Sequence, residues 1–229
     1  MRAVIGCLAG LSVAGLAGAA QAQAGPSFDC SAAATAVEET VCGFADLAWL
    51  DQSVAWLYRA LAEGLDAERR SGLRAEQRAW LRERDRCNDR GEAGGSLYAC
   101  TYAAYADRLS SLAAALEANP SGVYDYAAEG DSSGVLLLAV LPGDTTGATA
   151  GAVISTVTGR TAHLCDVAFS DVPFADGRLA WRSSEDIYGD GQLCTVSLGV
   201  DGDVVTIASE NCSGYCGHNA WFDGDYVRR

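Results

Sequence analysis

The residues with the clearest potential for chemistry are two cysteines and a histidine near the C-terminus, Cys212, Cys216 and His218. A nearby imidazole lowers the pKa of a thiol, so this group could act as a redox or nucleophilic site. However, the spacing is not Cys-x-x-Cys, and no thioredoxin-like βαβ pattern surrounds it. A zinc site that uses these cysteines with His163 or His218 would need thiolates, for which an oxidising compartment competes. We therefore expect the two cysteines to form disulfides.

Paired carboxylates are the second group with chemical potential. Glu185-Asp186 and Asp223-x-Asp225 contain the residue types of glycosidase acids and of calcium ligands, although such residues also occur in turns. The sequence has no Gly-x-Ser-x-Gly, phosphate-binding loop, His-Glu-x-x-His or complete EF-hand loop. We predict that the protein is not an enzyme and that it has no catalytic residue, cofactor or metal site.

The N-terminal segment predicts export. Arg2, an apolar run over residues 3–20 and the small-residue site Ala22-Gln-Ala24 have the pattern of a secretory signal peptide, residues 1–24. Cys7 lies at the beginning of the apolar run, whereas a lipoprotein cysteine lies at its end, so we do not expect anchoring there. No later run approaches the roughly 20 apolar residues of a membrane span, so the mature chain should not insert into a membrane.

Eight cysteines remain after the signal peptide, an even number that favours disulfides in an exported chain. This predicts a periplasmic or extracellular protein. The eight residues are Cys30, Cys42, Cys87, Cys100, Cys165, Cys194, Cys212 and Cys216.

The mature chain is strongly acidic. It keeps 30 acidic residues but only 15 arginines, since Arg2 belongs to the signal peptide, and with no lysine its net charge is −15. Such a surface repels nucleic acid and anionic membranes, and it attracts a basic protein or a cation. Solubility alone is the alternative reason for this charge. Most of the excess lies beyond residue 118, where 15 acidic residues accompany 5 arginines.

Residues 25–118 are predicted to form a helical domain of four helices. Thr35 and Glu38 form a capping box for a short helix, Asp46 is expected to cap the second helix, and Ser96 the fourth. Apolar residues repeat at three and four positions, which predicts one buried face on each long helix. These faces carry Leu47, Leu50, Val54, Leu57, Leu61 and Leu65 in the second helix, and Tyr98, Tyr102, Tyr105, Leu109, Leu112 and Leu116 in the fourth.

The third helix, predicted over residues 67–87, combines a charged surface with one apolar stripe. Gln77, Trp80 and Leu81 lie on this stripe, and we interpret them as the packing centre of the helical domain. The helix ends at Cys87, which could form a disulfide with Cys100 in the first turn of the fourth helix.

The disulfide pairing in the helical domain stays open at this point. Cys30–Cys42 together with Cys87–Cys100 would stabilise the domain by on the order of 3 kcal/mol per loop. The alternatives are 30–87 with 42–100, and 30–100 with 42–87.

A second domain follows a linker at 119–122, where a proline and a glycine interrupt the pattern and its period changes from 3.6 to 2. Residues 123–229 are predicted to form an antiparallel eight-stranded β-barrel or sandwich, so the fold class is α+β with two domains. We expect Cys165–Cys194 and Cys212–Cys216 disulfides, and a mobile loop over residues 141–151. The expected strands are 122–126, 135–140, 152–158, 162–169, 178–182, 193–200, 204–208 and 220–227.

The order and spacing of the cysteines and motif residues in the helical domain resemble the LprI-type lysozyme-inhibitor family. The similarity covers roughly residues 27–117. The 87–100 gap is longer and richer in glycine than the family pattern, and the β domain lies outside the resemblance. The residues that carry it, besides the four cysteines, are Phe28, Asp29, Glu38, Leu50, Asp51, Tyr58, Gln77, Trp80, Leu81, Arg84, Tyr105 and Arg108.

The resemblance implies a disulfide-linked helical domain in the cell envelope, and inhibition of a host-type lysozyme. The first functional hypothesis is therefore an inhibitor whose partner is a basic lysozyme. The alternative is a non-inhibitory envelope module whose β domain binds a cell-wall fragment, a small ligand or a partner protein. The candidate contact residues are Trp181, Tyr215 and Trp221, because tryptophan and tyrosine are frequent at interface hot spots.

Overall fold

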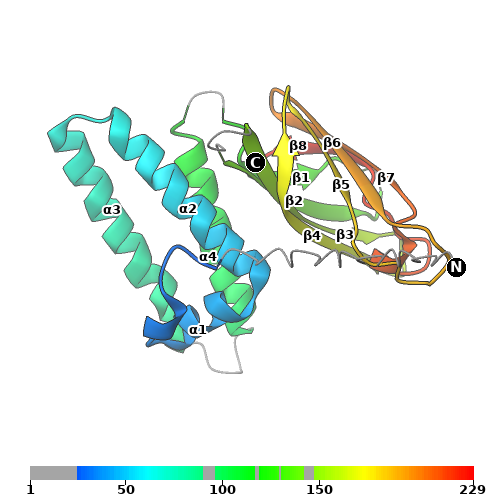
Figure 1. Cartoon of the computed structure of the whole chain (residues 1–229), viewed down its shortest axis with the longest axis horizontal. Coiled ribbons are helices and arrows are strands. Elements are labelled where there is room, and N and C mark those ends of the chain that lie inside the picture. Colours follow the sequence, from blue (N-terminus) through cyan, green and yellow to red (C-terminus); the bar gives the residue numbers. More distant parts are fainter. Residues whose placement is uncertain (1–24, 90–95, 117–118, 129, 142–146) are drawn as a thin grey trace, which may run out of the picture.

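The computed structural model describes residues 25–89, 96–116, 119–128, 130–141 and 147–229. The predicted signal peptide with Cys7 lies outside these residues, as do the glycine-rich segment 90–95 and residues 142–146 of the predicted mobile loop. The fold is α+β with two domains, as the sequence predicts, and the helices lie beside one face of the β domain (Figure 1).

Four α-helices and two short 3-10 helices form the first domain. Ser96 accepts a hydrogen bond from the amide of Ala99 and caps the last helix, and Thr35 and Glu38 form the predicted capping box. The helices are η1 (Cys30–Ala32), α1 (Ala36–Gly43), α2 (Ala45–Gly64), α3 (Ala67–Asp85), η2 (Arg86–Asp89) and α4 (Leu97–Ala113).

The prediction that Asp46 caps the second helix is wrong. Only Phe44 separates α1 from α2, and Phe44 is the N-cap residue, with an extended backbone and no side-chain hydrogen bond. Asp46 therefore lies in the first turn of α2, where a carboxylate still interacts favourably with the helix dipole. Its carboxylate accepts hydrogen bonds from the amide of Leu47 and from the hydroxyl of Tyr98 on α4.

The core of the helical domain lies between α2 and α4, on the faces that the sequence predicts. The α2 and α4 residues at the centre are buried, and those nearer the ends pack against them while partly exposed. The prediction that Gln77, Trp80 and Leu81 form this centre is wrong, because all three are partly exposed. Helix α3 lies on the outer side of the bundle and contributes Leu73 as its buried apolar residue (Figure 1).

Eight antiparallel strands form a single sheet in the order β4-β3-β2-β1-β8-β7-β6-β5. The sheet curls into a nearly closed barrel, with β4 and β5 at its edges and a bridge between Ala175 and Arg178 at the turn that joins them. The strands are β1 (Gly122–Tyr126), β2 (Ser133–Leu141), β3 (Ala148–Thr158), β4 (His163–Phe174), β5 (Arg178–Arg182), β6 (Thr195–Asp201), β7 (Val204–Glu210) and β8 (Gly224–Arg228).

Two segments of the β domain differ from their predictions. Strand β3 already begins at Ala148, so part of the segment predicted as a mobile loop is strand. Strand β8 begins four residues later than predicted, because a 3-10 helix, η3 (Ser213–Tyr215), and an irregular segment precede it. The barrel interior is filled by side chains, as is usual for eight strands.

Strand β2 contributes to two apolar cores, one on each of its faces. Leu136, Leu138 and Val140 point into the barrel, whereas Leu137 and Ala139 pack against α2 and α4. This explains why the sequence of this strand is apolar at every position from 135 to 140, without the alternation of a strand that has one exposed face.

Gly151 of β3 permits the closest approach of the helices to the barrel. A Cβ atom at this position would lie 2.5 Å from Cε2 and Cζ2 of Trp49 on α2, and 2.8 Å from the carbonyl oxygen of Phe169. The register between β3 and β4 shifts at this point, between Ala150 and Ala152. The bulge and the missing side chain together make room for the indole.

We therefore predict that Gly151→Ala lowers the free energy of unfolding by about 1–3 kcal/mol, because the added methyl group overlaps the indole and the backbone. Urea denaturation measures this loss. Gly199→Ala on β6 is the matched control, because no atom lies within 4 Å of the added Cβ there. Equal stability of both variants would contradict the close packing of Trp49.

Candidate functional site

A pocket of about 380 Å³ opens between the N-terminal segment and helices α1, α2 and α3. Most of the side chains that carry the sequence motif converge on it, although they are spread over nearly sixty positions. Carboxylates, one guanidinium and apolar side chains share its surface. Its lining consists of Ser27, Phe28, Glu38, Asp51, Val54, Ala55, Gln77, Trp80, Leu81, Arg84 and Asp85.

A chain of hydrogen bonds forms the base of this motif pocket. Nη1 of Arg84 donates to the Tyr105 hydroxyl over 2.9 Å, and this hydroxyl donates to Oδ1 of Asp51 over 2.7 Å. The other oxygen of Asp51 accepts from the amide of Ser27. Arg84 and Asp51 are only 5% and 7% exposed. Each buried charge is therefore stabilised by the opposite charge, to which the Tyr105 hydroxyl connects it.

The tyrosine stays neutral in this chain and acts as a bridge. Burial first, and then the carboxylate of Asp51, raise the pKa of Tyr105 above its usual range. Arg84 also donates from Nε and Nη2 to Asp85, and its guanidinium carbon lies 5.7 Å from the centre of the Trp80 ring. The guanidinium is thus held by hydrogen bonds and by two aromatic faces.

Other motif residues attach α3 to α4 by polar contacts. The indole of Trp80 donates to the carbonyl of Ala104 over 3.1 Å, and Gln77 accepts two hydrogen bonds from Arg108. The Cys87–Cys100 disulfide joins η2, directly after α3, to α4. The motif residues therefore attach α3, a charged helix with few apolar side chains, to α4.

The remaining motif residues are dispersed around this region. Leu50 is buried in the helical core, and Tyr58 packs against it from a partly exposed position. Asp29 caps η1 by accepting from the amide of Ser31. Tyr105 and Arg108, which the resemblance also includes, lie on α4 and are the polar partners of Arg84, Asp51 and Gln77.

The structure joins all eight cysteines of the β and helical domains in four disulfides, Cys30–Cys42, Cys87–Cys100, Cys165–Cys216 and Cys194–Cys212.

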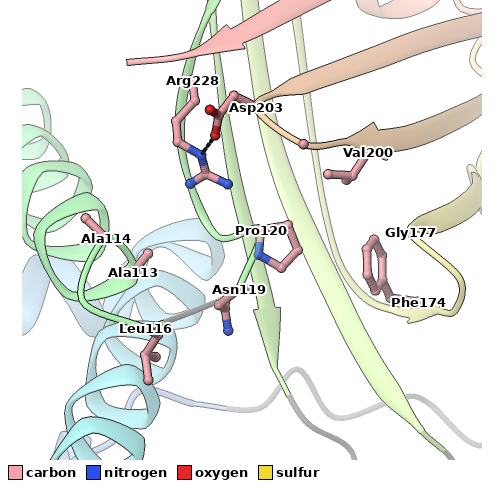
Figure 2. Close-up of a pocket in the computed structure, with 11 residues that line it drawn as sticks. Ala113, Ala114, Leu116, Asn119, Pro120, Phe174, Gly177, Val200, Asp203 and Arg228 are labelled. Atoms are coloured by element: carbon pink, nitrogen blue, oxygen red, sulfur yellow. Dashed lines mark hydrogen bonds and ion pairs between the residues drawn. The ribbon is translucent and has the colours of Figure 1, made fainter.

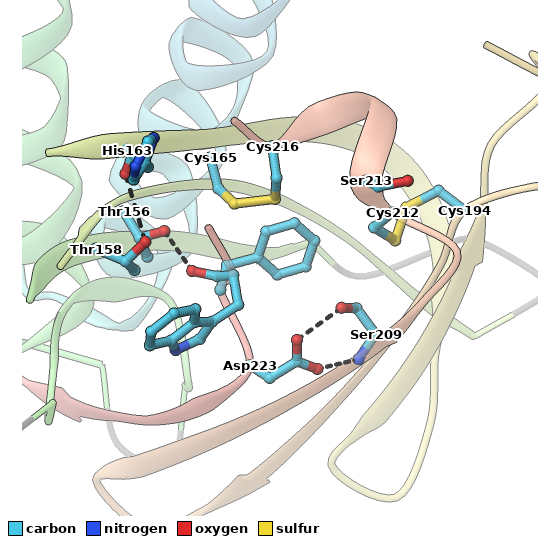
Figure 3. The surroundings of a disulfide bond; sticks show 12 residues. Thr156, Thr158, His163, Cys165, Cys194, Ser209, Cys212, Ser213, Cys216 and Asp223 are labelled. Carbon is cyan, nitrogen blue, oxygen red and sulfur yellow. Dashed lines mark hydrogen bonds between the residues drawn. A yellow bond between two sulfur atoms is a disulfide. The ribbon is translucent and has the colours of Figure 1, made fainter. Parts of the chain in front are cut away.

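The predicted pairs Cys165–Cys194 and Cys212–Cys216 are wrong. Cys212 and Cys216 lie at opposite ends of η3, and each faces a different part of the barrel (Figure 3). Cys216 lies beside Cys165 of β4, with 4.0 Å between the Cα atoms, whereas Cys212 follows β7 and meets Cys194 just before β6. Both cysteines of the proposed redox group are therefore engaged with other partners.

The predicted contact residues differ in exposure, and two of them, Trp181 and Tyr215, lie against each other with 5.9 Å between their ring centres. Trp181 and Tyr215 are partly buried and pack on the barrel core, where the ring of Trp181 stacks on Phe169 at 5.0 Å. Trp221 is exposed, and its indole donates to the hydroxyl of Tyr126. In the acidic pairs, Asp186 accepts hydrogen bonds from three backbone amides of its own loop. Asp223 accepts hydrogen bonds from the amide and the hydroxyl of Ser209 (Figure 3).

A wider groove of about 710 Å³ lies between the end of α4 and the turns at one end of the barrel (Figure 2). Its walls include Leu116, Pro120 and Phe174. The guanidinium of Arg228 at its edge bonds Asp203, the carbonyl of Ser121 and the hydroxyl of Tyr124. The charged groups of this groove are therefore largely engaged within the protein.

Among the described residues, no group of three or more His, Cys, Asp and Glu side chains is arranged to hold a metal ion. In the same part of the chain, no helix has the length and apolar character needed to cross a membrane.

These features define a disulfide-linked helical domain joined to a β-barrel, with a pocket lined largely by residues of the sequence motif. Residues 30–115 match the model of the family described as "Lysozyme inhibitor LprI". This confirms the resemblance that the sequence of the helical domain indicates, and the match ends before β1. No curated protein and no solved structure gives a significant match. The disulfides and the family match together indicate an exported protein.

The buried charges of the motif pocket give a direct test of its structural role. We predict that Arg84→Met lowers the free energy of unfolding by about 3–5 kcal/mol, because it leaves Asp51 buried without a positive charge. Arg82→Met, on the exposed side of the same helix, should change it by less than about 0.5 kcal/mol. Urea denaturation measures both, and a stable Arg84→Met variant would mean that the network contributes little.

The disulfide pairing of the β domain is open to chemical mapping. Cleavage after Glu185, Glu210 and Tyr215 in the non-reduced protein places Cys165, Cys194, Cys212 and Cys216 on four different peptides. Mass spectrometry should find Cys216 linked to Cys165 and Cys212 linked to Cys194. A peptide that joins Cys165 to Cys194 would contradict the arrangement around η3.

Proposed function

We propose that this protein is an exported inhibitor that binds a basic lysozyme in the periplasm or outside the cell. The observation that carries the proposal is the match of residues 30–115 to a lysozyme-inhibitor family. In this function the protein acts by binding, and none of its residues has a catalytic role.

The charge of the chain supports a basic partner. The sequence has a formal net charge of −14, and lysozymes with a basic surface would be attracted to it over a distance of about one Debye length. The disulfides support export, because such bonds persist in oxidising compartments. They also suit a protein that must stay folded outside the cytoplasm.

A second candidate function is a non-inhibitory envelope module that binds a small ligand. The groove between α4 and the barrel favours it, since its volume of about 710 Å³ is in the range of ligand sites. Its engaged polar groups count against it, because ligand sites usually offer free polar groups that fix the orientation of the ligand. The inhibitor is therefore the function we prefer.

Inhibition can be measured directly. The purified protein at micromolar concentration and low salt should reduce the turnover of bacterial cell wall by a c-type lysozyme. The inhibition should weaken as the salt rises from 0.1 to 1 M, because the Debye length falls from about 10 to about 3 Å. Unchanged lysozyme turnover at low salt would contradict the proposed function.

A further inference from the structure

The loop between β5 and β6, residues 183–194, exposes two adjacent apolar side chains. Tyr188 is 64% exposed and Ile187 is 47% exposed, although side chains of this size are usually covered when they are adjacent. The loop lies at the end of the barrel away from the helical domain (Figure 1). It is also outside the residues that match the family model.

The base of this loop is closed by the chain itself. The amide of Ser183 donates to the carbonyl of Cys194 over 2.8 Å, and the amide of Cys194 donates to the hydroxyl of Ser183. The Cys194–Cys212 disulfide then fixes the same end of the loop to the segment that follows β7 (Figure 3). Both ends of the loop therefore have a defined position.

Ile187 and Tyr188, which form the tip of this loop, contact η3. Ile187 packs so closely on Gly214 that an added Cβ there would lie 2.7 Å from its Cδ1 atom. The hydroxyl of Tyr188 donates to the carbonyl of Ser213 over 3.0 Å. One face of each side chain is thus held while the other faces solvent, so little conformational entropy would be lost on binding.

The surroundings of the tip are acidic. Glu185, Asp186 and Asp190 lie within the loop, which contains no arginine, and the preceding Arg182 ends β5. Glu185 and Asp190 are exposed. An apolar tip within a negative field is complementary to a concave surface with basic residues around it.

We propose that the β5–β6 loop is the surface that docks into the cleft of a basic lysozyme, with Ile187 and Tyr188 as the apolar anchors. Glu185 and Asp190 pair with basic residues at the edge of the cleft. This inference rests on the proposed inhibitory function. It assigns partner recognition to the β domain, while the helical domain serves as its support.

Other exposed apolar residues are less suited to this role. Leu164 and Val227 stand singly on the outer faces of β4 and β8, and single exposed apolar residues are ordinary on protein surfaces. Trp221 also stands singly, since its neighbour Phe222 is buried. The adjacent, supported pair on the loop distinguishes it from these positions.

The test compares full-length variants in binding to c-type lysozyme by calorimetry and in inhibition of its turnover. Ile187→Ala with Tyr188→Ala should weaken both by about 30-fold to several hundred-fold, because two anchors are removed. Phe44→Ala is the matched control, since Phe44 is 49% exposed but lies on the helical domain. Circular dichroism must give the same melting curve for the variant and the wild type.

A second variant tests the charges without altering the packing of the tip. Glu185→Gln with Asp190→Asn should slow association by about three- to tenfold at low salt, and the difference should vanish at 1 M salt. Because both side chains are exposed, this variant should fold normally.

The outcomes separate the two proposals. If the wild type inhibits and the Ile187/Tyr188 variant inhibits equally well, the loop is not the docking surface and the proposed function stands. If the wild type neither binds nor inhibits the lysozyme, the proposed function itself is overturned, and the loop loses its assigned partner with it. Loss of binding in the folded loop variant, with Phe44→Ala unchanged, supports both.

Discussion

The structure depends on the burial of one strand on both of its faces. Leu136 and Leu138 of β2 lie in the barrel interior, and Leu137 and Ala139 lie under helices α2 and α4, all without exposure to solvent. Each fully buried leucine contributes about 1.5–3 kcal/mol relative to an exposed one. If the helices separated from the barrel, half of this strand would face water. The two domains therefore differ in architecture, but the stability of each depends on its contact with the other along β2. This contact also keeps the far end of the barrel at a fixed position relative to the helices.

Polar contacts hold the part of the helical domain that the apolar core does not reach. Helix α3 has one buried apolar residue, and its attachment to α4 depends on Arg84, Gln77, Trp80 and a disulfide. Such contacts need defined partners at defined distances, which gives a physical reason for the specific residue types of the motif. The pocket is the space left between these contacts. We accordingly assign the motif to the architecture of the domain, and partner recognition to surfaces that it supports.

Much of this fold could be predicted from the sequence, because the signals were local. Helical periodicity gave the buried faces of α2 and α4, and breaker residues with period-2 patterns gave all eight strands.

The errors concern contacts between distant segments. Cys165 pairs with Cys216, across 51 positions, because η3 folds back onto β4, and no local pattern reports that fold. The stripe on α3 was interpreted by its period alone, which cannot distinguish a central helix from one at the edge of a bundle. The β5–β6 loop went unrecognised as a surface, because only the structure reveals which side of Tyr188 is covered.

The central claim, that burial of β2 on both faces makes the two domains one energetic unit, is tested most directly by scanning calorimetry of the oxidised full-length chain. We expect a single transition whose calorimetric enthalpy equals its van't Hoff enthalpy, because unfolding of either domain alone would remove the cover of Leu137 and Ala139. Two separate transitions, or a calorimetric enthalpy well above the van't Hoff value, would contradict this claim, since the helices and the barrel would then unfold independently.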